Sequence, residues 1–106
     1  MLSPTDRQIA LEFRRRIEKV VRVIDARVFG SRARGDATAG SDLDVFIEVE
    51  AITPAQRRQV DEIAWEVGFA MDRVIAPIVV TSEQLQRGPM AANPLLIRVE
   101  QEGAPV

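Results

Sequence analysis

Two short motifs, a Gly-Ser pair at residues 30–31 and an Asp-Leu-Asp triplet at residues 42–44, constrain the fold of this 106-residue chain more than any other feature. The first motif directly follows an apolar pair that ends at Phe29, so a strand that reaches the motif would stop there and turn. A turn made of small residues leaves backbone N–H groups pointing outward, where they can bind phosphate oxygens. We therefore predict a phosphate-binding turn at Gly30 and Ser31.

The Asp-Leu-Asp triplet opens a second predicted strand. Side chains alternate between the two faces of a strand, so Asp42 and Asp44 share one face, while Leu43 and the apolar residues at 45, 47 and 49 share the other. The apolar face would pack on the core, which leaves the two carboxylates side by side where the strand begins. Two such oxygen ligands suit Mg²⁺ or Mn²⁺. The triplet therefore predicts a metal site at Asp42 and Asp44.

The two motifs and their spacing resemble the signature of the minimal nucleotidyltransferases of the polymerase-beta superfamily. The resemblance rests on the Gly-Ser pair, ten intervening residues and the Asp-Leu-Asp triplet, and it extends to residues 32–36 and to Ser41. It implies a single nucleotidyltransferase domain over residues 1–106, of the α+β class. Such a domain has a small twisted mixed sheet with helices mainly on one face and the aspartates on the open side.

The resemblance also implies the roles of individual residues. Asp42 and Asp44 would be catalytic and would bind the metal, with Mg²⁺ (or Mn²⁺) as cofactor and ATP as the nucleotide substrate. Guanidinium groups pair well with phosphate oxygens, so Arg32 or Arg34 would meet the charge of the triphosphate. The full set of implied nucleotide-binding residues is Gly30, Ser31, Arg32, Arg34 and Ser41.

Family members commonly carry a third carboxylate on a later strand, where it faces the metal pair and helps to deprotonate the attacking hydroxyl. The corresponding predicted strand, residues 74–80, contains no acidic residue, and the positions in question hold Ala76, Pro77 and Ile78. Weaker substitutes would be Glu48, Asp72 and Glu83. Two carboxylates suffice to bind a metal-nucleotide, whereas transfer without a positioned base loses about 10² to 10⁴-fold in rate.

Composition excludes several classes of function. The chain is 46% hydrophobic and 28% charged, as in soluble globular proteins, and no apolar run approaches a membrane span. It contains no histidine and no cysteine, so carboxylates are its candidate catalytic acids, bases and metal ligands. The net charge of −2 argues against nucleic acid as the partner. No secretory signal is visible, and we expect a cytoplasmic protein.

Capping signals and apolar periodicity predict the element order α, β, β, α, β, α. Ser3-Pro4 with Asp6, and Thr53-Pro54 with Gln56, have the pattern of capping boxes that begin helices. The predicted elements are a helix to about residue 21, a strand in the later part of 23–29, a strand over 43–49, a helix from 54 to about 71, a strand over 74–80, a helical turn at 82–85 with a break at 87–89, and a helix from 94 that ends at Gly103.

Three further features carry structural expectations. Pro77 cannot donate a ladder hydrogen bond, so its strand should have an edge or a bulge there. Trp65 lies off the apolar stripe of its helix and would either flank the core, the favoured reading, or mark a partner surface. The run of arginines at 14–16 is expected to be a solvated helix face.

The leading functional hypothesis is an Mg²⁺-dependent nucleotidyltransferase that moves AMP from ATP to a hydroxyl and releases pyrophosphate. The short chain offers no acceptor-binding domain, so we expect the acceptor on a partner protein. Small proteins of this kind resemble the antitoxin half of two-gene modules, which implies a helical HEPN ribonuclease as partner. The alternative is a catalytically weak or inactive module that masks its partner. Transfer to a small molecule such as an aminoglycoside, or to an RNA end, is a weaker third hypothesis.

Overall fold

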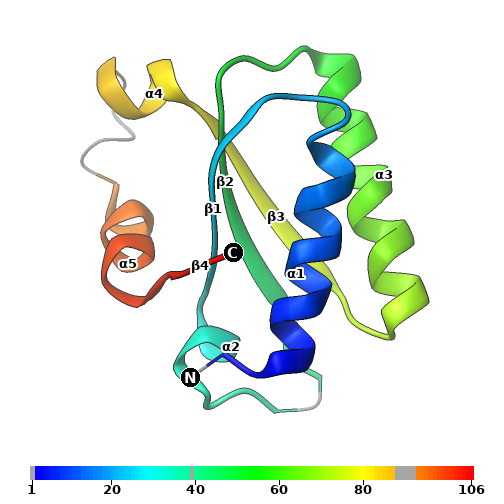
Figure 1. The fold of residues 1–106 in the computed structure, drawn as a ribbon. Coiled ribbons are helices and arrows are strands. Elements are labelled where there is room, and N and C mark those ends of the chain that lie inside the picture. The colour runs from blue at the N-terminus through cyan, green and yellow to red at the C-terminus, as the bar shows by residue number, and fades with distance from the viewer. Residues whose placement is uncertain (1, 39, 88–92) are drawn as a thin grey trace.

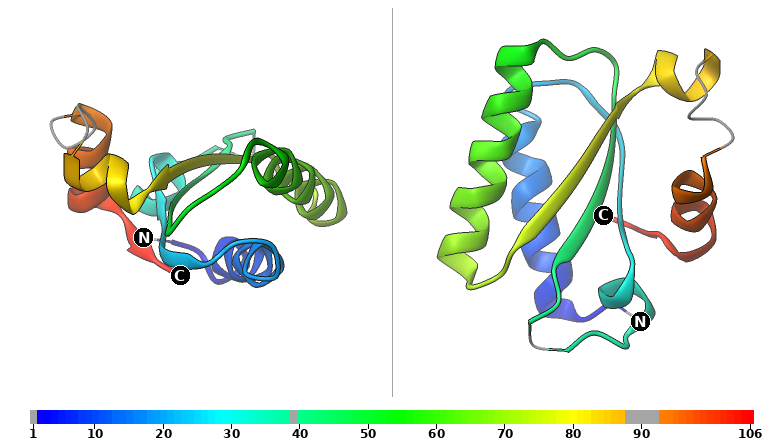
Figure 2. Two further views of the ribbon diagram at one scale, coloured as in Figure 1. Left: turned by 90° about the horizontal axis from the view of Figure 1, so that it is seen from above. Right: turned by 180° about the vertical axis from the view of Figure 1, so that it is seen from behind.

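The structure is a computed structural model that describes residues 2–38, 40–87 and 93–106. Four strands form one mixed sheet with helices on both faces (Figure 1, Figure 2). The strands are β1 (Val23–Phe29), β2 (Leu43–Val49), β3 (Ile75–Thr81) and β4 (Ala104–Pro105). The helices are α1 (Pro4–Ile17), α2 (Ser31–Arg34), α3 (Pro54–Met71), α4 (Ser82–Arg87) and α5 (Pro94–Glu102). This arrangement confirms the predicted α+β fold with a mixed sheet.

The sheet has the strand order β3-β2-β1-β4, and its register positions the two sequence motifs. β1 pairs with β2 and with β4 in antiparallel fashion, while β2 and β3 are parallel and joined through α3. Asp44 near the start of β2 lies opposite Phe29 at the end of β1 and opposite Ala76 on β3. One corner of the sheet therefore holds the end of β1 and the beginnings of β2 and β3.

The two long helices, α1 and α3, cover one face of the sheet, and α4 and α5 lie on the other face (Figure 2). The alternation predicted for β2 is confirmed, since Leu43 and its alternate neighbours pack into the core under α1 and α3. Phe46 points the other way, into a smaller cluster with Phe29, Val80, Leu96 and Val99. None of the described helices is long and apolar enough to cross a membrane.

Pro77 lies on the outer edge of the sheet, as one of the two predicted options. The backbone N–H of Leu43 donates to the carbonyl of Val74 at 2.8 Å, so alternate residues from Val74 onward direct their polar groups toward β2. Pro77 falls between them and faces away from β2, where its missing N–H costs no ladder bond. The pairing of β2 with β3 runs without a shift from Leu43–Ile75 to Val49–Thr81, so the bulge option is not used.

The element boundaries differ from the predictions in several places. α1 ends at Ile17 because the N–H groups of Val20 and Val21 both turn back to its carbonyl, whereas the prediction extended the helix to residue 21. β1 includes Asp25, whose carboxylate accepts from the Arg27 side chain at 2.9 Å. The short elements α2 and β4 were not predicted. β3 covers residues 75–81 instead of 74–80, and α4 extends to Arg87, which the prediction assigned to a break. Residues 88 and 89 of that break lie outside the described residues.

Trp65 does not flank the core, so that prediction is wrong. Its side chain is 69% exposed, and it stacks on Phe69, which is 77% exposed, on the outer side of α3. The helix buries Val60, Ala64 and Val67 instead. The second option from the sequence, a surface for a partner, is the one compatible with this position.

Gly68 of α3 packs closely against the backbone that follows the helix, so a larger residue there should lower the stability of the fold. A Cβ atom at this position would lie 2.4 Å from the backbone carbonyl oxygen of Arg73, where the chain leaves α3 for β3. Gly68→Ala should therefore destabilise the fold by about 1 to 3 kcal/mol through overpacking, although alanine normally favours a helix. Urea unfolding measures the change. Gly40→Ala is the control, because a Cβ atom there meets nothing within 4 Å, and equal stability of the two variants would contradict the close packing.

Candidate active site

The two sequence motifs meet at the corner formed by β1 and β2. Gly30 follows β1 with φ of 75°, and a Cβ atom at this residue would lie 2.5 Å from Oδ2 of Asp44. The backbone of the Gly-Ser turn thus runs against the Asp44 carboxylate at a distance that only glycine permits. The structure therefore brings Gly30 and Asp44 together at one corner of the sheet.

The predicted phosphate-binding turn is the beginning of the short helix α2. Ser31 is its first residue and is half-buried, and the N–H of Arg34 donates to the carbonyl of Gly30 at 3.1 Å. Gly35, with φ of 82°, ends the helix after this single turn. The first N–H groups of a helix have no partner within it, which leaves donors at the side of Gly30 and Ser31. Their binding to phosphate stays a prediction.

The electrostatics of Asp44 fit a divalent cation. Partial burial raises the pKa of the Asp44 carboxyl, and the charge of Asp42 raises it further. The positive charges of Arg98 and Arg34 lower the pKa of Asp44, but they do not cancel the increase. Two carboxylates that repel one another in a partly desolvated corner are the donor set that a hard divalent ion stabilises. Asp42 and Asp44 thus fit the metal predicted for them.

Arg32 is turned into the protein. Its side chain is only 9% exposed and forms an ion pair with Asp6 of α1, with 3.2 Å between Nη1 and Oδ2. It also donates to the backbone carbonyls of Ser41 at 2.9 Å and of Thr38 at 3.4 Å. The guanidinium thus holds the loop that leads to Asp42 against α1. Its predicted contact with nucleotide stays untested, and its described hydrogen bonds are all within the protein.

Asp6 is a site-supporting residue that the sequence interpretation missed. The capping box predicted for it is incomplete, because its N–H donates to Ser3 Oγ at 3.0 Å while its carboxylate faces inward. The side chain is 4% exposed and also lies 3.5 Å from Nε of Arg73. Its signal in the sequence is its position three residues before Ile9, on the apolar stripe of the helix.

Ser41 shapes the same loop. Its hydroxyl accepts from the backbone N–H of Thr38 at 3.0 Å, and its own N–H donates to the carbonyl of Thr38 at 3.1 Å. Together with the bonds from Arg32, these contacts fix the chain immediately before Asp42. The predicted contact of Ser41 with nucleotide stays a prediction.

Two exposed arginines supply positive charge near Asp44. Arg34 pairs with Asp36 at 3.2 Å and with Glu102 of α5 at 3.0 Å, and these two hydrogen bonds raise its pKa. Arg98 also lies on α5, and its positive charge lowers the pKa of Asp44. The sequence interpretation missed Arg98 and Glu102, because α5 carries no motif and the fold alone brings it to this corner.

No described residue supplies the third carboxylate. Ala76 is the β3 neighbour of Asp44 in the sheet register. Glu48 lies four residues further along β2, about 13 Å away, and accepts from Ser82 Oγ at 2.7 Å. Glu83 lies beyond the other end of β3, and Asp72 lines a cleft of about 740 Å³ beside α3. Among the described residues, no group of three acidic, histidine or cysteine side chains could hold a metal ion.

A family model described as "nucleotidyltransferase domain" matches residues 7–106. The chain belongs to the nucleotidyltransferase domain family. Among the curated proteins searched, none matches it. The predicted resemblance to this superfamily is therefore confirmed, and the corner at Gly30 and Asp44 is the candidate active site of a nucleotidyltransferase-family domain.

Two solved structures share the fold. A toxin–antitoxin crystal structure with AMP-PNP aligns with a TM-score of 0.65 at 17% identity, covering 92% of this chain and 69% of that one. A crystal structure of a toxin–antitoxin MntA–HpeT mutant aligns with a TM-score of 0.61 at 16% identity, covering 94% and 70% of the two chains. At these identities, the alignments show the common fold.

The raised pKa of Asp44 generates a prediction on pH and stability. A carboxyl whose folded pKa lies above its unfolded value binds protons more tightly when folded, so its ionisation costs stability as pH rises above the unfolded pKa. Without metal, Asp44→Asn should be more stable than the wild type at neutral pH, and the difference should shrink toward about pH 4. Urea midpoints at both pH values test this.

Asp61→Asn is the control for this experiment, since it removes an exposed carboxylate of α3 that lies outside the corner of Gly30 and Asp44. A metal-free Asp44→Asn variant that is less stable than the wild type at neutral pH would contradict the raised pKa that burial and Asp42 give to Asp44.

Proposed function

We propose that this domain binds ATP with Mg²⁺ at the corner of Gly30 and Asp44 and transfers AMP to a hydroxyl of a partner protein. The observation that carries the proposal is the approach of the Gly-Ser backbone to the Asp44 carboxylate, because it juxtaposes phosphate donors with a metal ligand. Membership of the nucleotidyltransferase family supports the reaction class.

Each residue of the corner has a proposed role. Asp42 and Asp44 would hold Mg²⁺, which would neutralise triphosphate charge and lower the barrier to phosphoryl transfer. The backbone at Gly30 and Ser31 would bind phosphate oxygens, and Arg34 would pair with the triphosphate in place of Glu102. In the reaction, a hydroxyl oxygen bonds to the α-phosphorus, the bond to the β-phosphate oxygen breaks, and pyrophosphate leaves.

A helical HEPN-type toxin is the proposed partner. Two proteins of the same fold come from toxin–antitoxin complexes, and one of these structures contains AMP-PNP. They support a role as an antitoxin that modifies or contacts a second protein. The charge of −2 gives no general affinity for nucleic acid, which favours a protein hydroxyl over an RNA end as acceptor.

A masking module is the second candidate function. It is favoured by Ala76, which stands beside Asp44 where a carboxylate would activate the acceptor hydroxyl. In this case the domain would bind its partner and a metal-nucleotide without transfer.

Nucleotide binding is tested by thermal unfolding with Mg²⁺ and ATP together. A ligand that binds only the folded state stabilises it, by about 2.7 kcal/mol at a hundredfold excess over its Kd, so the melting temperature should rise. The double variant Asp42→Asn with Asp44→Asn should fold and lose this shift. Gly30→Ala should weaken ATP binding more than Ser31→Ala, because its Cβ atom collides with the Asp44 carboxylate. A full Mg²⁺-dependent shift in the double variant would overturn the metal assignment.

Transfer is tested with ATP labelled at the α-phosphate and the protein encoded beside this chain. The wild type should label that protein slowly, and Asp44→Asn should abolish the label. Ala76→Asp should raise the rate of transfer by about 10²-fold or more, because a positioned general base contributes on that scale. Ile78→Asp is the matched control, because Ile78 packs against the Phe46 cluster and an acid there should only destabilise the fold. Binding of partner and nucleotide without any label, in Mg²⁺ and in Mn²⁺, would establish the masking module.

A further inference from the structure

The outer surface of the α1 and α3 layer exposes large apolar side chains. Trp65 and Phe69 of α3 stack with ring centroids 5.2 Å apart and planes inclined by 6°, and they are 69% and 77% exposed. Leu11 on α1 is 45% exposed. Large apolar side chains that gather at the surface mark contacts with other molecules, so this exposure points to a contact surface.

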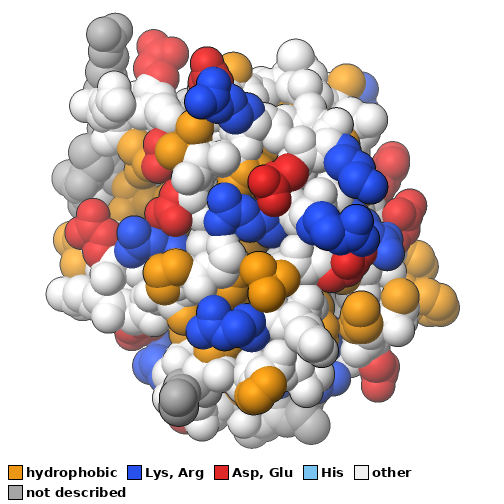
Figure 3. Space-filling model, in the orientation of Figure 1, with side chains coloured by type: hydrophobic (Ala, Val, Ile, Leu, Met, Phe, Trp, Pro, Cys, Tyr) orange, Lys and Arg blue, Asp and Glu red, His pale blue; other side chains and the backbone are white. Residues whose placement is uncertain are grey.

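The charges on the same surface are separated by helix. Leu11 and Arg15 lie four residues apart on the solvent side of α1, and Lys19 follows after four more residues, in the turn that leaves the helix. On α3, Glu62, Glu66 and Phe69 follow one another at helical spacing on the solvent side, and residues 60–71 contain no lysine or arginine. Figure 3 shows basic side chains over the upper part of α1, with acidic ones among them, and apolar side chains toward the outer side of α3. One helix therefore presents a basic stripe and the other an acidic one, each with an apolar end.

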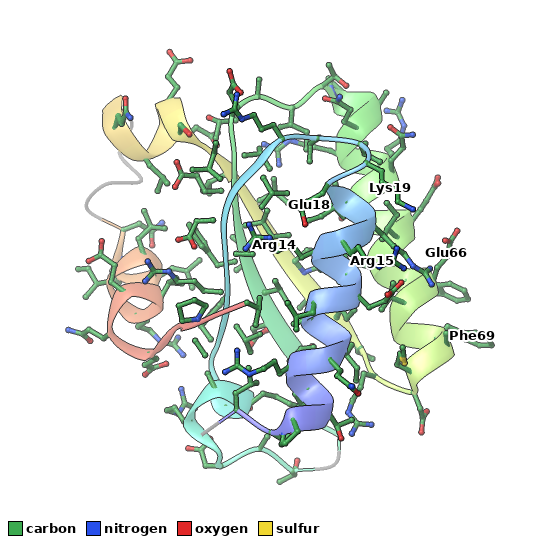
Figure 4. All side chains as sticks on the ribbon, in the orientation of Figure 1. Arg14, Arg15, Glu18, Lys19, Glu66 and Phe69 are labelled. Atoms are coloured by element: carbon green, nitrogen blue, oxygen red, sulfur yellow. The ribbon has the colours of Figure 1, made fainter. Side chains whose placement is uncertain are left out.

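The two helices run antiparallel, which brings the stripes into register. α1 and α3 lie side by side and point in opposite directions (Figure 1, Figure 2). Figure 4 shows Arg15 of α1 level with Glu66 of α3, with Lys19 above them and Phe69 below. Helical spacing then places Glu62 toward the level of Lys19 and Leu11 toward the level of Phe69.

We propose that this face binds a second copy of the chain around a two-fold axis parallel to α1 and α3. Such an axis sets α1 of each copy opposite α3 of the other and keeps every residue at its own level. Arg15 would meet Glu66, Lys19 would meet Glu62, and Leu11 would meet Phe69, each contact occurring twice. The surface is thus complementary to itself in charge and in apolar character. This inference goes beyond the proposed transfer reaction and does not depend on it.

The local ion pairs on α1 leave its positive charge in excess. Glu12 is shared between Arg15 at 2.8 Å and Arg16 at 2.7 Å, so one carboxylate faces two guanidinium groups. Arg14 pairs with Glu18 at 3.6 Å and also donates to the carbonyl of Val106. Such exposed pairs are weak and exchange readily, which leaves Arg15 available to a second partner.

The size of the face sets the expected affinity. The longer helix spans about 27 Å and two packed helices are about 20 Å wide, so each copy would contribute roughly 500 Å². Specific interfaces average about 800 Å² per partner, so we expect a weak dimer with a Kd of about 10 to 100 μM. Its affinity should fall with added salt, because the ion pairs form at an exposed surface.

The test is sedimentation velocity of the whole chain across that range of concentrations. The weight-average mass should rise from 11.8 kDa toward twice that value. Arg15→Glu alone should be monomeric, because it sets two acids against each other, and Glu66→Arg alone should be monomeric, because it sets two bases against each other. A mixture of these two variants should dimerise again, since both symmetric contacts then pair opposite charges.

Two controls separate this interface from general charge effects. Glu83→Arg reverses an exposed charge on α4, on the other face of the sheet, and should leave the dimer intact. Phe69→Ala should weaken dimerisation without changing any charge, and thermal unfolding should confirm that all variants fold. A wild type that stays monomeric at all concentrations overturns the proposal. Dimerisation that survives both single reversals, or fails to return in the mixture, assigns the contact to another surface and overturns it as well.

Discussion

The contact between the backbone of Gly30 and the carboxylate of Asp44 is the constraint on which the site depends. It exists because β1 and β2 pair with Phe29 opposite Asp44, so the turn that leaves β1 must pass over the beginning of β2. A side chain on Gly30 would occupy the position of an Asp44 oxygen. The sheet register, and the core of α1 and α3 that fixes it, therefore determine the distance between the phosphate-binding backbone and the metal ligand.

The basic residues of the motif divide into an inner and an outer group. Arg32 is used to tie the loop before Asp42 to Asp6, and a buried ion pair of this kind costs much to break because the remaining charge stays unpaired. Arg34 remains at the surface, where Asp36 and Glu102 balance it. Arg32 thus fixes the position of the loop that leads to the aspartates, while Arg34 provides positive charge at the surface of the site.

The motifs, the mixed sheet and the alternation along β2 could be predicted from the sequence because each is a local pattern of residue type and spacing. Asp6, Arg98 and Glu102 could not be assigned in this way, because their importance comes from partners 26 or more residues away or from the packing of α5. The prediction for Trp65 was wrong because helical periodicity identifies the buried face of α3 but does not predict the surroundings of an aromatic side chain outside that face. The sequence alone showed that residues 76–78 contain no acid. The sheet register adds that Ala76 is the one of these three positions that lies beside Asp44.

Pro77 has a consequence for how the protein behaves at high concentration. β3 is an edge strand, and an edge with a full row of outward N–H and C=O groups is a template on which strands of other molecules can add and grow into aggregates. The proline interrupts that row in the middle of the strand, with its ring where a donor would be. Sheet growth at this edge is therefore blocked at its centre, and replacing the proline would expose a continuous apolar strand to self-templated fibre formation.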